Sequence, residues 1–181
     1  MNNRSLLPRF LLCLAGSIPC AAFAQSPPAA DSPLHQLGVS AGRWVYHGHS
    51  LGSKPSDWTW HEDCRWSANG VFMLCSFSNT WAGRHVDSVV VDTYDPHGRS
   101  FWHYEVFNSG DSAGKPFASR MRIEGATRTE SWTDTRHGKS VRQRIVYKFA
   151  SDSKVTVVFQ RSEDGTHWET TATGTGERVR A

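Results

Sequence analysis

The feature that most constrains the fold is an Asn-Gly pair, Asn69-Gly70, between two runs rich in aromatic and apolar residues. Both residues tolerate the positive φ of a type I′ turn, so this pair is the strongest local signal of a β-hairpin. With Asn69 and Gly70 as the two loop residues, Cys64 falls opposite Cys75 in a hydrogen-bonded pair, whose Cα separation of about 5.5 Å suits a disulfide. A three-residue loop would shift the register by one and misalign the two cysteines.

The N-terminal segment, residues 1–24, has the features of a secretory signal peptide. Arg4 and Arg9 supply positive charge, and the apolar run 10–18 is too short to span a bilayer as a helix. An A-x-A cleavage sequence ends at Ala24. We therefore predict cleavage after Ala24 and a secreted or periplasmic mature chain, with an uncleaved N-terminal membrane anchor as the alternative.

Removal of this segment changes the composition on which any functional argument depends. Two of the four cysteines leave with it, and the formal charge falls from +3 to +1 with the loss of Arg4 and Arg9. The charge gives no reason to expect a nucleic acid or an anionic membrane as a partner. Nothing after residue 24 is long and apolar enough to span a membrane. The oxidising compartment that a signal peptide implies also favours the predicted disulfide.

The remaining chain suits a flexible linker followed by one domain. Residues 25–33 contain three prolines and few groups to bury, which is typical of a linker. Residues 34–181 are long enough to bury roughly 70% of the unfolded surface in one core. At its start we predict one or two helical turns over Leu34 to Ala41, with Ser32 as the N-cap and Pro33 in the first turn.

The rest of the domain is predicted to be all-β, an antiparallel meander closed into a barrel. Parallel strands need long crossover segments, and this chain has almost none between its apolar runs. Closure would also remove exposed sheet edges, although a two-sheet sandwich is a competing architecture. The interior of a barrel of this size either packs solid or holds one small ligand. The predicted strands are 43–49, 57–67, 71–81, 85–94, 100–107, 117–124, 127–134, 141–149, 154–161 and 167–177.

A resemblance to a known group begins at the first predicted strand. Gly42-Arg43-Trp44, after a short helical segment, resembles the G-x-W signature of the lipocalins and the wider calycin group. The resemblance implies that the tryptophan, Trp44, closes one end of a barrel. It also implies that an arginine from the last strand packs on this ring, and Arg178 is the candidate by position.

The stretch 34–178 also resembles a bacterial family of secreted, lipocalin-like proteins whose function is uncharacterised. This resemblance implies the lipocalin-like fold and carries no particular reaction. The shared features are Leu37, Gly42-x-Trp44, Tyr94-Asp95-Pro96 and Ser162-x-Asp164-Gly165-x-x-Trp168.

The predicted strands carry more aromatic residues than a half-buried sheet needs. One interpretation is that the aromatic side chains fill the barrel and close its ends. The functional interpretation is a cavity lined by aromatic residues and a few polar groups, as in many small-molecule sites. A buried Glu62 would need a partner there, and Arg43 or a histidine could serve. The candidate ligand-binding residues are Trp60, Glu62, Trp81, Trp102, His103 and Tyr104.

Histidine is abundant, with nine residues in the chain. His47 and His49 share one face of the first predicted strand, and His61 and His103 lie on strands expected nearby. Converging imidazoles could bind zinc or a haem iron. None of them lies in a recognised metal signature, so we predict no metal or other cofactor.

The sequence contains no recognised catalytic motif: no G-x-S-x-G, no P-loop and no G-x-G-x-x-G. We therefore predict a barrel that binds a small apolar or amphipathic molecule. One alternative is an enzyme that uses Glu62 or a histidine as an acid or base. Another is an envelope protein-interaction module with a filled core. The oligomeric state is left open.

Overall fold

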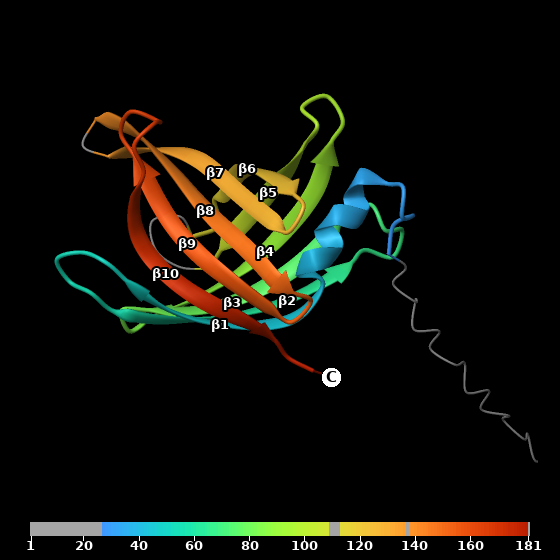
Figure 1. The fold of residues 1–181 in the computed structure, drawn as a ribbon, viewed down its shortest axis with the longest axis horizontal. Coiled ribbons are helices and arrows are strands. Elements are labelled where there is room, and N and C mark those ends of the chain that lie inside the picture. The colour runs from blue at the N-terminus through green and yellow to red at the C-terminus, as the bar shows by residue number, and fades with distance from the viewer. Residues whose placement is uncertain (1–26, 109–112, 137, 181) are drawn as a thin grey trace, which may run out of the picture.

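The computed structural model of the chain describes residues 27–108, 113–136 and 138–180. Within them, ten antiparallel strands form a closed barrel, preceded by one 3-10 helix (Figure 1). The predicted all-β barrel is confirmed, and the two-sheet sandwich is excluded. The elements are η1 (Pro33–Ser40), β1 (Gly42–Ser50), β2 (Asp57–Trp66), β3 (Met73–Trp81), β4 (Arg84–Asp95), β5 (Ser100–Phe107), β6 (Pro116–Glu124), β7 (Thr127–Arg136), β8 (Lys139–Ser151), β9 (Lys154–Ser162) and β10 (Glu169–Arg178).

Each strand pairs with its neighbour in sequence, and β10 returns to β1, with Trp44 opposite Arg178. The connections therefore alternate between two ends of the barrel. At one end η1 lies across the opening, beside short turns such as 152–153, and we call this the covered end (Figure 1). The other end, which we call the far end, carries the connections 51–56, 82–83 and 163–168. The predicted signal peptide, residues 1–24, lies outside the described residues.

The β2–β3 hairpin has the predicted register. Cys64 lies opposite Cys75, and the two form a disulfide with a Cα separation of 4.1 Å. This separation is shorter than the predicted value because the pair is not the hydrogen-bonded one. Within antiparallel pairs, the non-hydrogen-bonded type has the closer Cα atoms, at about 4.5 Å.

The cause is the turn, where the prediction of a two-residue type I′ loop was wrong. Gly70 has a positive φ of 67°, whereas Asn69 does not. Ser67 N donates to Phe72 O, so four residues form the loop and the hydrogen-bonded pairs move by one position. The Asn69 side chain accepts a hydrogen bond from Ser67 Oγ at 2.8 Å. This local side-chain bond favours the wider turn.

Helix η1 is fastened to the covered end by Trp44 and Arg178. The Arg178 guanidinium lies 4.6 Å from the centroid of the buried Trp44 ring, the arrangement that the calycin resemblance implies. The same guanidinium donates to the backbone carbonyls of Val39 and Ala41, where the helix ends. Cationic side chains satisfy terminal helix carbonyls in this way. At the other end of η1, Ser32 Oγ accepts from Leu34 N as the predicted N-cap.

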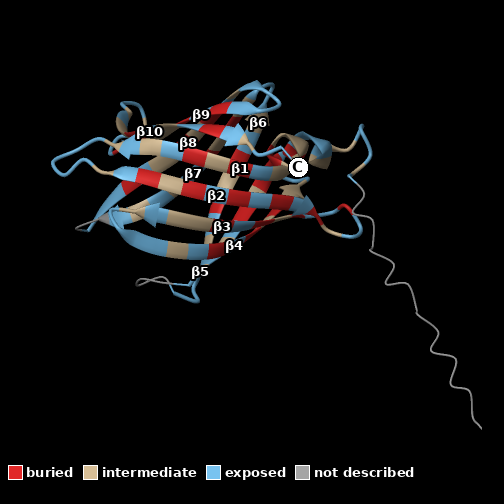
Figure 2. Ribbon diagram, turned by 90° about the horizontal axis from the view of Figure 1, so that it is seen from below, coloured by how far each residue is buried: buried red, intermediate tan, exposed pale blue. Residues whose placement is uncertain are grey.

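Inward and outward residues alternate along the strands with a period of two (Figure 2). In β2 the inward set is Trp58, Trp60, Glu62, Cys64 and Trp66.

One irregularity interrupts this alternation near the start of β10. A bulge between Thr170 and Ala172 shifts the register of β10, so Ala172 points inward while Trp168 lies against the outer Arg144 at 3.9 Å. Among the described residues, no helix is long and apolar enough to cross a membrane.

Candidate functional site

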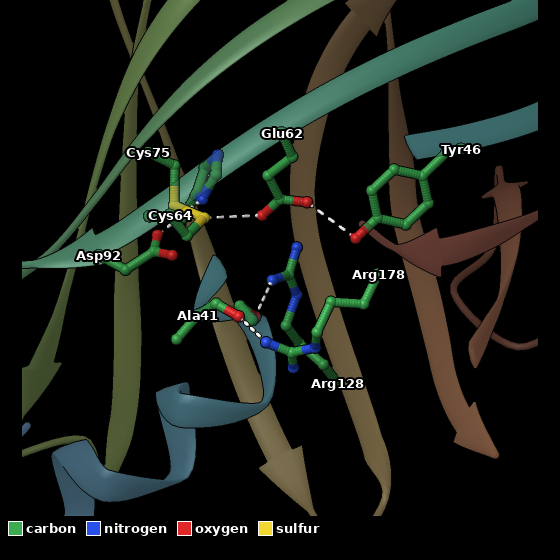
Figure 3. Close-up of a disulfide and its surroundings, with 10 residues drawn as sticks. Ala41, Tyr46, Glu62, Cys64, Cys75, Asp92, Arg128 and Arg178 are labelled. Atoms are coloured by element: carbon green, nitrogen blue, oxygen red, sulfur yellow. Dashed lines mark hydrogen bonds and ion pairs between the residues drawn. A yellow bond between two sulfur atoms is a disulfide. The ribbon is translucent and has the colours of Figure 1, made fainter. Parts of the chain in front are cut away.

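The covered half of the interior is organised around a buried arginine, Arg128 of β7. Its Nη1 donates to Ser40 Oγ at 2.6 Å, and its guanidinium lies 4.0 Å from the centroid of the Tyr147 ring. Glu62 lies beside it and accepts a hydrogen bond from the Tyr46 hydroxyl at 2.8 Å (Figure 3). The other Glu62 oxygen is 2.9 Å from Cys64 Sγ, which has no proton to donate because it is in the disulfide. These groups form a packed polar floor.

Burial and mutual charge shift the acid–base properties of this floor. Burial raises the pKa of Glu62, and the nearby Arg128 offsets only part of that effect. Burial, with the adjacent Glu62 charge, raises the pKa of Tyr46 well above its usual value, so its hydroxyl remains a neutral donor. Burial works to lower the pKa of Arg128, but electrostatic interactions with Tyr147, Glu62 and Asp92 outweigh it and raise the pKa. Arg128 is therefore a permanent buried cation.

A second polar cluster lies around His103 of β5, which is 4% exposed. Its Nδ1 is 2.8 Å from Asp92 Oδ1. Its Nε2 is 3.7 Å from Glu105 Oε2 and 3.6 Å from Glu130 Oε1. Burial works to lower the pKa of His103, but Glu130 and Asp92 outweigh it and raise the pKa well above its usual value. The imidazole is therefore charged at neutral pH, with three carboxyl groups around it.

Two serines complete this second cluster. Ser119 Oγ donates to Glu130 Oε1 at 2.7 Å, and Ser88 Oγ donates to Glu105 Oε1 at 2.5 Å. The members come from four strands, β4 to β7, so only the rolled sheet brings them together. Because each carboxylate is held by a neighbouring strand, its position is fixed before any ligand arrives.

A cavity of about 150 Å³ separates this cluster from the aromatic wall opposite. The lining residues near the far end, among them Asn79, Trp81 and Phe107, are half-buried. Lining residues further inside the barrel, such as Trp60, His103 and Tyr147, are buried. The cavity therefore deepens from a rim at the far end towards the polar floor. The lining residues are Trp60, Phe77, Asn79, Trp81, Val86, Ser88, His103, Glu105, Phe107, Glu130, Ile145, Tyr147 and Phe159.

The structure brings three of the six predicted ligand-binding residues together. Trp60, Trp81 and His103 line the cavity. Glu62 points inward but belongs to the floor, where it contacts Tyr46.

Trp102 and Tyr104 lie on the outer face of β5, apart from the cavity. They alternate with the inward His103, and Tyr104 is 40% exposed. Their rings stack on each other at 5.7 Å, and the Arg120 guanidinium lies 3.5 Å from the Trp102 ring. Both faces of β5 carry aromatic residues, so alternation alone does not tell which face is inside.

The sequence prediction did not find the charged partners of this site. The expected partner of Glu62 was Arg43 or a histidine, but Arg43 is exposed on the outer wall and Arg128 takes that role. Glu130 was missed as well. One signal was present: Arg128, Glu130 and Trp132 share one parity in β7, so charged residues occupy the same face as an aromatic one.

Metal binding finds little support in the geometry. In the described ranges, one group of side chains has its potential ligand atoms close enough for a metal ion, namely Glu62, Cys64 and Cys75. Its two sulfurs are bonded to each other and cannot act as thiolates. His47, His49 and His61 are exposed on the outer wall, so they do not converge with His103.

A larger hollow of about 630 Å³ lies on the outer face of β1 to β5. Its outward side chains include Val89 and Val106, which are 61% and 44% exposed. Its outward carboxylates, Asp63 and Asp87, are exposed to solvent, whereas Glu105 and Glu130 of the interior cavity accept hydrogen bonds from the buried Ser88 and Ser119. We place the candidate site in the interior because desolvated polar groups give a small ligand orientation and specificity.

No protein-family description and no curated protein matches the chain. Similar solved structures include Rv2717c from M. tuberculosis, at 10% identity and a TM-score of 0.53, covering 82% of this chain and 98% of that one. The S-type phycobiliprotein lyase CPES from Guillardia theta is similar at 11% identity and a TM-score of 0.51, covering 80% and 91%. At these identities the likeness shows the fold alone. The fold is that of a calycin-like ten-stranded barrel, consistent with the lipocalin-like prediction.

Proposed function

We propose that this chain is an exported barrel protein that binds one small molecule in its interior cavity. The observation that carries the proposal is the cavity itself: about 150 Å³ of space between an aromatic wall and a buried cluster of ionisable groups. A cavity of about this volume is known to hold a benzene ring. The expected ligand therefore has a ring-sized apolar body of roughly six to ten non-hydrogen atoms.

The lining supports a ligand with two chemically different ends. Trp60, Trp81 and Phe159 supply apolar ring surfaces, and Glu105 and Glu130 supply hydrogen-bond acceptors. Sites of this kind use the apolar wall for affinity and a few fixed polar groups for orientation. The predicted amphipathic ligand agrees with this arrangement, whereas a long lipid chain exceeds the volume.

The test of binding is native mass spectrometry of the protein purified from its own host, followed by solvent extraction. We expect a co-purifying small molecule at one per chain. An Ile145→Trp variant, which fills the cavity, should lack it, because Ile145 lines the cavity from β8. Recovery of a bare chain from every preparation, with no binding in a library of ring-sized molecules, would contradict the proposal.

Export is part of this proposal. The signal-peptide features of residues 1–24 support it, and so does the Cys64–Cys75 disulfide, because disulfides persist in oxidising compartments. Cell fractionation tests it by comparing the full chain with a chain that begins at Gln25. We expect the protein expressed from the full chain to be found outside the cytoplasm, with the mass of a chain that begins at Gln25. The full-length mass in the cytosol would contradict export.

The geometry around His103 favours a second candidate function, acid–base catalysis. A carboxylate, Asp92, holds Nδ1, and Nε2 lies near Glu105 and Glu130, which line the cavity. Because the imidazole is charged at neutral pH, this arrangement suits a general acid. Incubation of the identified ligand with the protein separates the two functions. A new product mass that appears with wild type and not with His103→Gln indicates an enzyme, whereas unchanged ligand indicates a binding protein.

A further inference from the structure

We propose that the molecule held in this cavity is a small organic cation, such as an aromatic or aliphatic ammonium or amidinium. This inference rests on the proposed function and specifies the chemistry of the ligand. It follows from the balance of charge inside the barrel, from the positions of the carboxylates on the cavity wall and from the aromatic surface opposite them.

The balance of charge around the cavity is negative. Asp92, Glu105 and Glu130 surround His103, so a protonated imidazole neutralises only one of three carboxylates. The other buried cation, Arg128, lies in the floor with Glu62, Ser40 and the Tyr147 ring, and its charge also interacts with Asp92. Two interior cations, Arg128 and His103, therefore face four interior carboxyl groups, those of Glu62, Asp92, Glu105 and Glu130. A net negative charge in a low-dielectric interior is costly unless a positive group compensates for it. A cationic ligand supplies that group.

The two glutamates are arranged to receive it. His103 Nε2 is 3.7 Å from Glu105 and 3.6 Å from Glu130, distances beyond a normal N–H···O hydrogen bond. Each of these two carboxylates accepts a hydrogen bond from a neutral hydroxyl, Glu105 from Ser88 and Glu130 from Ser119. A carboxylate has about four acceptor sites, so both retain capacity for a charged donor. Both residues also line the cavity.

Two further polar groups of the lining are unsatisfied. Trp60 Nε1 and Asn79 Oδ1 are buried, and within the described part of the chain neither has a hydrogen-bond partner. Trp60 is only 8% exposed, and both residues line the cavity. Buried polar atoms without partners are rare in folded proteins and call for an explanation such as a missing ligand. Asn79 Oδ1 can accept a hydrogen bond from a cationic donor, whereas Trp60 Nε1 is a donor and calls for an acceptor atom on the ligand. Trp44 Nε1, Trp58 Nε1 and Arg128 Nε are also buried without partners among the described residues, but they do not line the cavity.

The wall opposite the carboxylates suits a cation on an apolar body. Trp60 packs against Phe77, Tyr147 and Phe159, with ring centroids 5.3, 6.2 and 6.2 Å apart. Aromatic faces attract cations and stack on rings. A metal ion is the less suitable cation, because among the described side chains His103, Glu105 and Glu130 do not form a group close enough to ligate one.

The test compares three probes that share one ring and differ in charge: benzylamine, benzyl alcohol and benzoate. Isothermal titration calorimetry at neutral pH measures their binding to the mature chain. We expect benzylamine to bind at least tenfold more tightly than benzyl alcohol, and benzoate not to bind. Charge-assisted hydrogen bonds justify a difference of this size.

Variants locate the effect within the cavity. Glu105→Gln and Glu130→Gln keep the shape of the side chain and remove its charge. Each should raise the Kd of benzylamine about tenfold or more and change the Kd of benzyl alcohol by no more than about twofold. Glu124→Gln is the matched control, because Glu124 is exposed at the end of β6, and it should change neither. Thermal unfolding of each variant verifies that it is folded. If a variant does not fold, the comparison of the three probes on wild type still tests whether the cavity prefers a cation.

The two proposals fail in different ways. Benzyl alcohol or benzoate that binds as tightly as benzylamine would overturn the cationic ligand and leave the binding cavity intact. Benzylamine binding that survives both glutamate variants unchanged would also overturn the assignment of the site. A complete absence of binding by all three probes at millimolar concentration, together with the absence of a co-purifying molecule, would overturn the binding function itself.

Discussion

Arg128 is a charged residue held in the interior of the barrel. It is 2% exposed, and its charge lowers the pKa of the adjacent Glu62 more than the charge of His103 does. Its guanidinium links η1 through Ser40 to β8 through the Tyr147 ring. A buried ion pair is often no more stable than an apolar replacement, but removal of one partner leaves an uncompensated charge. The loss of Arg128 should therefore destabilise the fold more than the intact ion pair stabilises it.

Substitution of Arg128 by methionine should lower the free energy of unfolding by about 3–5 kcal/mol, because Glu62 is left buried and uncompensated. Urea unfolding followed by tryptophan fluorescence measures the change. The control is Arg122→Met, on the exposed face of β6, which should stay within about 0.5 kcal/mol. The double variant with Glu62→Leu should recover part of the loss. A loss below about 1 kcal/mol in the single variant would contradict this account of the floor.

His103 makes stability depend on pH in a direction that can be worked out. Its folded pKa lies well above the ordinary 6.5, mainly because Glu130 and Asp92 outweigh the effect of burial. The stability from its protonation is complete below about 6.5 and falls as the pH rises towards the folded pKa. The facing groups are Asp92 of β4, Glu105 of β5 and Glu130 of β7.

The measurement is the difference in unfolding free energy between wild type and His103→Gln at several pH values from 6 to 10. We expect this difference to shrink as the pH rises, by at most about 1.4 kcal/mol per pH unit. A difference that stays constant, or that grows with pH, would show that His103 is neutral in the folded protein.

At the scale of elements, the junction of β1 and β10 determines how the rim of the cavity is packed. Trp58 stacks on Trp81 with ring centroids 5.7 Å apart, and Trp81 lines the cavity. The Trp58 ring can take this position because Gly48 and Gly174 lie beneath it without side chains. The two glycines therefore help to shape a cavity that neither of them lines.

Gly174→Ala should destabilise the barrel by about 1–3 kcal/mol, the usual cost of overpacking. The new Cβ would lie 2.5 Å from Trp58 Cη2 and 2.6 Å from the backbone oxygen of His47, which β1 holds in place. Thermal or urea unfolding measures the effect, and the near-ultraviolet circular dichroism of the tryptophans should change with it. Gly38→Ala is the control, since nothing lies within 4 Å of its Cβ position, and it should have little effect. Equal stability of both variants would contradict the packing described.

The elements themselves were predictable from the sequence, because alternation and turn residues are local signals. All ten strands lie within about two residues of their predicted bounds, which is the usual uncertainty of strand ends. The Cys64–Cys75 register was predictable for the same reason, although the turn type was not. A local hydrogen bond from Ser67 to Asn69 decided that turn.

At the scale of the whole molecule, the candidate site depends on closure of the barrel. Arg128 of β7 contacts Ser40 of η1, which is 88 residues earlier in the chain. Alternation tells which residues of one strand share a face, but not at which depth they lie or which strand stands opposite. His103 could therefore be proposed from the sequence, whereas Glu105 and Glu130 could not be assigned to it. On β5, with aromatic residues on both faces, even the inward set was undecided.

Closure also divides the interior into two functional halves. The covered half is filled by η1, Trp44 and the polar floor, and the far half keeps a cavity with negative groups on one wall and aromatic rings on the other. This division combines a well-packed covered half with a far half that has space for the proposed ligand. It also accounts for the position of the disulfide, which fixes β2 to β3 beside the floor.

The most direct measurement is a crystal structure of the mature chain grown with benzylamine. The account predicts electron density for the ring among Trp60, Phe77 and Phe159, with the ammonium nitrogen within hydrogen-bond distance of Glu105 and Glu130. An interior filled by protein side chains, with no density for the amine and no space for it, would contradict the central claim.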